Sequence, residues 1–449
     1  MSTIDPGDPR VVRAAAAVLA VDGSLEVGAG IPASPGVLAA AEARGYFTPG
    51  EDEAIRVRYR AFLAGRTALL EALTAMEDAC GTKENQWIER LPALVVALAA
   101  GCLLMRGSRE LVGIAETSRL LRKKLDEADP RRGIPRKTFA RIYRATTDPR
   151  RLARFHDALA FYRAHRDAVQ EPEAGGRYAE LRNRLDALVD DFPLPDGAKI
   201  FRDRARYRWF SFRRRHHSAW KRAVFGVFED AGCRIADLHQ PGHAVGPKRV
   251  TPELREAVLG LARPGDVFVT RHDDALSNLF LPGFWPHAAL HIGTEAQRRE
   301  LGVEMDLPRE AADPARFLEA KKDGVRFRPA EETLAVDRLV VLRPPLTPAE
   351  IAAAIARAGS HAGKLYDFVF DFRTSDRLVC TEVVYRAYHG ELDFQLVESG
   401  GRLCLPAEVL IDQAIEMGFR VVATVNLGGG GLLTGTAAET ALHATRAGL

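Results

Sequence analysis

The spacing of apolar residues changes character about halfway along the chain. Up to about residue 230, apolar residues recur every three or four positions, which is the period of an amphipathic helix. Alternation of strand type is absent from this half. We therefore expect an all-helical domain over residues 1–235, with helices at about 85–105, 108–128, 136–146, 149–169 and 176–190.

A further helix is expected to begin at Thr48-Pro49, because proline suits a first turn and the acids that follow suit the positive end of the helix dipole. The most apolar run, Leu91–Met105, is shorter than the roughly 20 residues that a membrane span needs. We expect this run to be a buried core helix.

The second half combines strand and helix patterns. Residues 236–252 contain Gly and Pro with little periodicity, which is typical of a linker. Beyond them, apolar runs predict strands, and Asp323-Gly324 predicts a hairpin. We expect an α+β domain over 253–425 with a small, mostly antiparallel sheet, and a Gly-rich mobile tail over 426–449. The expected strands are 266–270, 287–292, 316–320, 325–328 and 339–342, and the helices are 348–361 and 380–389.

The composition limits the kinds of site and partner that we expect. The net charge of +3 over 449 residues points to no particular partner. The five cysteines form no CxxC pair and are odd in number, so we expect neither a structural zinc site nor a disulfide framework. We expect no metal and no cofactor. The first residues lack a signal-peptide pattern, so a cytoplasmic location is expected, and the oligomeric state stays open.

Residues 199–222 form a basic and aromatic stretch with ten Lys or Arg and one Asp. Such a stretch suits contact with an anionic membrane surface or with nucleic acid. It equally suits a solvated helix whose aromatic side chains face a core. We favour the solvated helix, keep membrane contact open, and do not expect a nucleic-acid partner.

Three residues of the second half are candidates for chemistry. Cys380 opens a predicted helix, where the dipole and free N–H groups favour a thiolate, although a cysteine is also a common small core residue. His287 begins a strand and shares one face with His291, so the pattern alone does not choose between them as a base. Glu319, on another strand, is suited to orient an imidazole, but is otherwise typical of a surface.

Five motifs that follow one another along the chain strengthen the case for these three residues. They are Gly265-Asp-Val-Phe-Val, Pro286-His-Ala-Ala-Leu-His-Ile-Gly293, Phe317-Leu-Glu-Ala with Gly324-Val, Gly363-Lys-Leu-Tyr-Asp-Phe368, and Val379-Cys-Thr-Glu-Val-Val384. Together, over roughly residues 260–395, they resemble the circularly permuted NlpC/P60 or papain-like hydrolases and are most similar to the YiiX/YaeF-like group. In that group the histidine strand precedes the nucleophile helix.

The resemblance implies roles for particular residues. It implies Cys380 as nucleophile, His287 rather than His291 as base, and Glu319 as the orienting residue. It implies that Tyr366, Asp367 and Glu382 shape the substrate site, to which His291 is also adjacent. Because the charged segment 294–314 is inserted before Glu319, Glu304 is an alternative third residue.

The resemblance also implies an activity. We expect a cysteine hydrolase that cleaves an amide or ester of a peptide or lipid substrate through a thioester. One alternative is a lipid-directed acyltransferase or phospholipase at a membrane surface. Another, of a different class, is a binding or scaffold protein whose papain-like domain is inactive.

Overall fold

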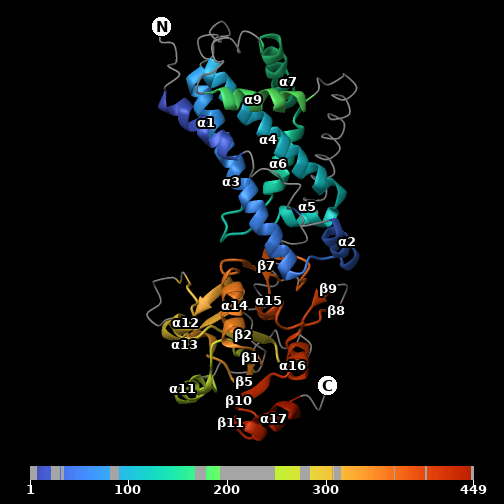
Figure 1. Cartoon of the computed structure of the whole chain (residues 1–449). Helices are drawn as coiled ribbons and strands as arrows, with labels where there is room; N and C mark the ends of the chain where they lie inside the picture. The colour runs from blue at the N-terminus through green and yellow to red at the C-terminus, as the bar shows by residue number, and fades with distance from the viewer. Residues whose placement is uncertain are drawn as a thin grey trace. The chain divides into compact units, whose positions relative to one another are not determined.

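The computed structural model describes residues 8–21, 31, 35–80, 91–166, 178–192, 248–273, 284–305, 307, 315–368, 370–399 and 402–445. The basic aromatic stretch 199–222 and residues 236–247 of the expected linker lie outside these described residues. The chain divides into two compact units (Figure 1). The first comprises Met1–Ala128 and Ile134–Ala219, and the second comprises Asp129–Gly133 and Trp220–Leu449.

The described residues of the first unit are helical, as the sequence predicts. Its helices are α1 (Pro9–Val21), α2 (Pro35–Arg44), α3 (Pro49–Cys80), α4 (Leu91–Thr117), α5 (Arg119–Leu125), α6 (Thr138–Thr147), α7 (Pro149–Ala164) and α9 (Ala179–Asp190). Helix α3 begins at the expected place, because Thr48 N–H donates to Glu51 and Glu51 N–H donates back to the Thr48 hydroxyl. One correction concerns α4, which runs unbroken where two helices were expected.

The core of the first unit forms around α4. Within the expected run Leu91–Met105, most described side chains are buried, among them Val96, Ala99 and Leu103. They pack with residues of α1, α3, α6 and α9. Leu91–Met105 is therefore a core segment. In the described part of the chain, no helix has both the length and the apolar character needed to cross a bilayer.

The second unit combines strands and helices. Its helices are α11 (Pro252–Leu261), α12 (Glu295–Glu300), α13 (Ala330–Thr333), α14 (Pro348–Gly359), α15 (Cys380–Tyr388), α16 (Ala407–Glu416) and α17 (Gly435–Ala444). Its strands are β1 (Val267–Arg271), β2 (His287–His291), β3 (Phe317–Lys321), β4 (Gly324–Arg328), β5 (Arg338–Arg343), β6 (Leu365–Tyr366), β7 (Arg377–Leu378), β8 (Val397–Ser399), β9 (Arg402–Cys404), β10 (Arg420–Val425) and β11 (Leu432–Thr434).

One antiparallel sheet organises this unit. Its seven strands follow the order β11-β10-β5-β1-β2-β3-β4. The predicted hairpin is confirmed, since β3 and β4 pair across the Asp323-Gly324 turn. One face packs against α14, α15 and α16, and the other packs against α11 and α13. The sheet is larger than expected, because β10 and β11 extend it beyond β5.

The expected mobile tail is the main correction. Gly428–Gly431 all have positive φ, a conformation that glycine adopts at no steric cost. They form a turn that returns the chain so that β11 pairs with β10. Helix α17 follows and buries Ala438 and Leu442. The glycine run is therefore a turn within the fold.

The end of the expected linker also belongs to the second unit. The N–H of Val250 donates to the carbonyl of Val336 at 3.0 Å, and Val250 is buried beside α11. The Asn426 side chain donates to the carbonyl of Arg249 at 2.9 Å. Residues 248–252 are thus attached to the sheet, and any linker ends before them.

Candidate active site

Cys380 is the first residue of α15. Val379 before it is extended, and the first turn closes through a bond from Val383 N–H to the Val379 carbonyl. Helix α15 is buried along its whole length and packs on β2 and β3, so its position is fixed by the core. The sulfur lies at the positive end of the helix, where a thiolate is stabilised. Only 4% of the Cys380 surface is exposed.

His287 is the first residue of β2. The backbone just before it is held by Glu408 of α16, whose carboxylate accepts hydrogen bonds from the N–H groups of Phe284 and Trp285. The ring of His287 is hydrogen-bonded to the side chain of Cys380. His287 and Cys380 are 93 positions apart in sequence, and β2 and α15 bring the histidine ring against the thiol.

Glu319 lies on β3, on the other side of the imidazole. Its Oε2 atom is 2.5 Å from Nε2 of His287, so Nδ1 is the ring nitrogen left for Cys380. Its Oε1 atom accepts a bond from the Thr333 hydroxyl at 3.0 Å and lies 2.8 Å from Nζ of Lys321. Glu319 has no exposed surface. Its carboxylate is therefore fixed by hydrogen bonds on both oxygens.

The three groups shift one another's pKa values. Burial raises the pKa of Cys380, but the charge and hydrogen bond of His287 outweigh it, and the pKa is lowered overall. Burial lowers the pKa of His287, but Cys380 and Glu319 together raise it to about 9. Despite burial, His287 and Lys321 lower the pKa of Glu319 to about 2. The site therefore favours a thiolate, an imidazolium and a carboxylate.

Backbone donors surround the sulfur. The N–H groups of Ala288 and Thr381 both donate hydrogen bonds to Cys380 and lower its pKa. One comes from the strand that carries His287, and the other comes from the first turn of α15. Donors of this kind are suited to stabilise negative charge that develops beside the sulfur.

Tyr366 of β6 also lies beside this centre. Burial raises the pKa of its phenol, and the negative charges of Cys380 and Asp367 raise it further. Its ring meets Phe368 edge-on, with centroids 5.0 Å apart. Tyr366 is therefore a neutral donor close to Cys380, next to an aromatic wall.

Asp367 and Glu382 lie in a buried polar layer behind the nucleophile. Asp367 accepts a bond from the N–H of Asp371 at 2.8 Å. Glu382 accepts a bond from Arg386 at 2.8 Å through Oε1, while its buried Oε2 has no hydrogen-bond partner among the described residues. Burial and then Asp367 raise the pKa of Glu382 to about 8, although Arg386 opposes this shift.

His291 and Glu304 are not brought into this centre. Nδ1 of His291 is 2.9 Å from the Arg263 carbonyl, and burial lowers its pKa to about 4, so the ring stays neutral. It is packed between the rings of Phe268 and Phe317. It lies four positions from His287 along β2, roughly 13 Å away. The expectation that His291 shapes the substrate site is therefore wrong, because its ring is part of the core, and Glu304 is exposed.

The sequence reasoning missed several residues of the site. Lys321 follows Glu319 by two positions on the same strand, so strand alternation predicts the pairing that the structure shows. Arg328, from the neighbouring strand, lies 3.3 Å from Glu319 Oε1 through Nε. His272 lies near enough to His287 for their charges to interact, and burial lowers its pKa to about 4. No pattern in the sequence indicates the roles of Thr333 and Glu408.

The described residues were also compared with the requirements of a metal site. No group of three or more His, Cys, Asp and Glu side chains lies close enough together there to hold an ion.

This arrangement defines the class of domain. A cysteine at the start of a buried helix, packed on an antiparallel sheet whose histidine strand comes earlier in the chain, is a papain-like site in permuted order. Residues 262–403 match the family described as permuted papain-like amidase enzyme, YaeF/YiiX, C92 family. The resemblance predicted from the five motifs is confirmed for this segment. No curated protein and no solved structure matches the chain.

Proposed function

We propose that the chain is a cysteine hydrolase of the amidase type, with Cys380 as nucleophile, His287 as acid and base, and Glu319 as the residue that orients His287. The observation that carries this proposal is that the His287 ring is hydrogen-bonded to Cys380 on one side and to Glu319 on the other. In a buried structural cysteine, burial raises the pKa of the thiol, as it does for Cys102.

The first half of the reaction forms an acyl-enzyme. The Cys380 thiolate attacks the carbonyl carbon of the substrate, and the carbonyl π electrons move onto oxygen. As the tetrahedral species collapses, the bond to the leaving nitrogen or oxygen breaks. The His287 imidazolium gives its proton to that leaving atom, and a thioester on Cys380 remains.

The second half regenerates the enzyme. The now neutral His287 takes a proton from water as the water oxygen attacks the thioester carbon. The carbon–sulfur bond then breaks, and the electron pair returns to sulfur. Thiolate and imidazolium are restored, and the product leaves as a carboxylic acid.

Glu319 and Tyr366 support these steps in different ways. Glu319 keeps Nε2 of His287 engaged, so Nδ1 stays directed at Cys380 and the imidazolium is stabilised throughout. The Tyr366 phenol and the N–H of Thr381 are the donors that we assign to the substrate oxyanion. Asp367 and Glu382 are assigned no proton transfer, and they shape the site from behind.

The experiment is to trap the acyl-enzyme. The intact protein is mixed with p-nitrophenyl acetate and separately with an aminoacyl p-nitroanilide, and its mass is measured before and after hydroxylamine. We expect one acyl group per chain, released by hydroxylamine, for both the ester and the amide. Release of nitroaniline shows amidase action, whereas acylation by the ester alone shows an esterase or acyltransferase.

Two variants serve as a matched pair. Cys380→Ala should lose the acyl group, and Cys404→Ala should keep it, since Cys404 lies away from His287 and has a raised pKa. If neither probe acylates the wild-type chain, or if Cys380→Ala is acylated equally, the proposal fails. The alternative of an inactive papain-like domain then holds.

A further inference from the structure

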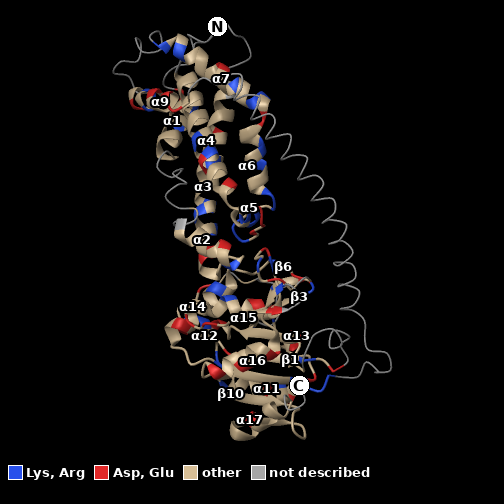
Figure 2. Cartoon of the chain, turned by 90° about the vertical axis from the view of Figure 1, so that its right-hand side faces the viewer, with Lys and Arg blue, Asp and Glu red and all other residues tan. Residues whose placement is uncertain are grey.

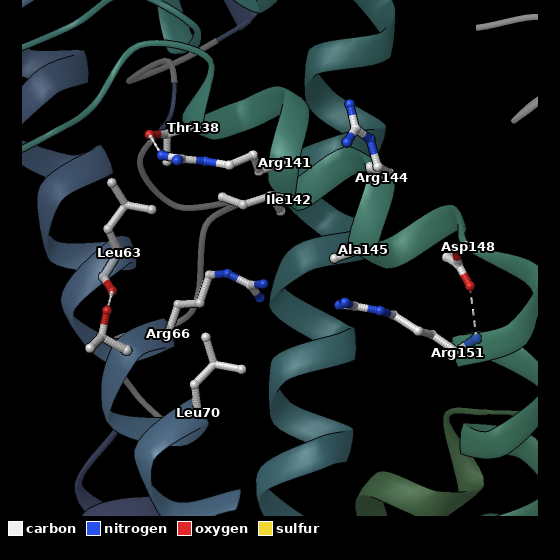
Figure 3. Close-up of a pocket in the computed structure, with 11 residues that line it drawn as sticks. Leu63, Arg66, Leu70, Thr138, Arg141, Ile142, Arg144, Ala145, Asp148 and Arg151 are labelled. Carbon is white, nitrogen blue, oxygen red and sulfur yellow. Dashed lines mark hydrogen bonds between the residues drawn. The ribbon is translucent and has the colours of Figure 1, made fainter. Parts of the chain in front are cut away.

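A basic pocket lies in the helical unit, and its lining residues take no part in the proposed reaction. It occupies about 430 Å³ between α3, α6 and the start of α7 (Figure 3). Four arginines line it: Arg66 of α3, Arg141 and Arg144 of α6, and Arg151 of α7. Lys and Arg positions are visible along α6 and around α5 in Figure 2.

These arginines have no carboxylate partner among the described residues. Arg66 donates to the hydroxyl of Ser108 at 3.1 Å, and Arg141 donates to that of Thr138 at 2.9 Å. Asp148 is the one acid among the lining residues. Its Oδ1 accepts the backbone N–H groups of Arg150 and Arg151, so its hydrogen bonds cap α7 and are not made to the guanidinium groups.

Two of the guanidinium groups oppose each other. Figure 3 shows the side chains of Arg66 and Arg151 pointing toward one another across the pocket. Arg66 is partly buried, and after burial itself the positive charge of Arg151 lowers its pKa further. Two like charges held in one hollow repel, and this repulsion is removed when an anion lies between them.

The shape of the pocket selects the kind of anion. Guanidinium groups that approach from opposite sides suit a phosphate, whose oxygens accept hydrogen bonds in several directions, better than a planar carboxylate. Part of the remaining wall is apolar and is formed by Leu63, Leu70 and Ile142. Leu70 is 41% exposed, so it offers uncovered apolar surface next to the charges.

We infer that this pocket binds a phosphate-bearing ligand with a small apolar body, with Arg66 and Arg151 holding the phosphate. The ligand is either a soluble phosphate monoester or the headgroup of a phospholipid. The volume lies within the range of pockets for small ligands.

The test is isothermal titration of the full chain with hexyl phosphate, in phosphate-free buffer of low ionic strength. We expect one site per chain, no binding of hexanol, and weaker binding as salt is raised. Arg151→Gln and Arg66→Gln should each weaken binding about tenfold or more, because each variant loses a charge-assisted hydrogen bond to the phosphate. Arg154→Gln is the control, since Arg154 is an exposed arginine of α7 that does not line the pocket.

Experiments with lipid vesicles distinguish a phospholipid headgroup from a soluble phosphate ester as the ligand. Sedimentation with phosphatidylcholine vesicles that contain phosphatidic acid, lost in Arg151→Gln but kept in Arg154→Gln, assigns a lipid headgroup. Binding of hexyl phosphate without sedimentation assigns a soluble ester. The inference is overturned if the wild-type chain binds neither probe. It is equally overturned if folded Arg151→Gln, whose exposed side chain spares the core, binds as the Arg154→Gln control does.

Discussion

The Nε2 atom of His287 lies 2.5 Å from the Oε2 atom of Glu319, and this contact connects the first residue of β2 to the middle of β3. It leaves the other ring nitrogen for Cys380 and, after the thiolate of Cys380, contributes most to keeping the imidazole protonated. The carboxylate is itself held by Thr333 and Lys321. The pair therefore controls both the orientation and the charge of His287.

Replacing Glu319 tests this control. Glu319→Gln keeps a polar side chain but removes the negative charge, so the pKa of His287 should fall below about 9. Hydrolysis should drop by about 10²-fold or more, the usual contribution of a positioned acid and base. The chain should also lose about 1–3 kcal/mol of stability, because Lys321 and Arg328 lose their buried partner.

The measurement is the pH dependence of hydrolysis, with Glu304→Gln as the control. Glu304 is an exposed carboxylate that the sequence offered for the same role. The alkaline limb should lie near 9 in the wild type and in Glu304→Gln, and lower in Glu319→Gln. Equal profiles in all three proteins would remove Glu319 from the site.

His291 is expected to matter for folding alone. His291→Asn keeps a donor near Nδ1 for the Arg263 carbonyl but loses the ring between Phe268 and Phe317. It should cost about 1–3 kcal/mol, as partial emptying of a core does. The rate of Cys380 alkylation should be unchanged, whereas His287→Asn should slow it. A slower rate in His291→Asn at full stability contradicts the assignment.

Glu382 is expected to make stability depend on pH. Its pKa is raised to about 8 in the folded chain, against 4.5 for the ordinary carboxyl, so between these values the folded state holds a proton that the unfolded state has lost. Stability from this group therefore falls as pH rises from about 4.5 to about 8. In Glu382→Gln this decline should disappear.

Denaturant unfolding at several pH values checks this dependence. The free energy of unfolding of Glu382→Gln relative to the wild type should increase with pH across that range. A difference that stays constant with pH would show that Glu382 is ionised throughout, as its bond to Arg386 alone would favour.

The C-terminal segment is expected to stabilise the sheet. Leu442 of α17 is fully buried, so Leu442→Ala should cost about 2–5 kcal/mol. Glu439→Ala, at an exposed position of the same helix, should change stability by no more than about 0.5 kcal/mol. Thermal unfolding of the two variants compares them. Equal melting temperatures would show that residues beyond 426 are held loosely after all.

The sequence predicts the contact between Cys380 and His287 better than it predicts the edge of the sheet. Strand and helix periods locate β1 to β5, α14 and α15, because these segments are strongly patterned. The motif order adds the pairing of Cys380 with His287. The fold beyond residue 426 was missed because four consecutive glycines are typical of a mobile loop, and their positive φ values and the pairing of β11 with β10 show a turn.

The residues that support the site also differ in how well the sequence predicts them. Lys321 was predictable from its spacing to Glu319, since both lie on one strand face. Glu408 was not, because its role is to hold the backbone before His287 from a helix more than 120 positions away. Contacts that depend on tertiary packing leave no periodic signal, so the sequence indicates the candidate residues and not the contacts that position them.

The most direct test of the account is the pH dependence of Cys380 alkylation by iodoacetamide, followed by peptide mass analysis in the wild type and in His287→Ala. We predict that Cys380 titrates below the ordinary thiol pKa of 9.0 and reacts faster than Cys404 at neutral pH. In His287→Ala its midpoint should rise above 9.0, since burial then acts without the imidazolium. A wild-type midpoint at or above 9.0, unchanged in His287→Ala, would contradict the proposed thiolate–imidazolium pair.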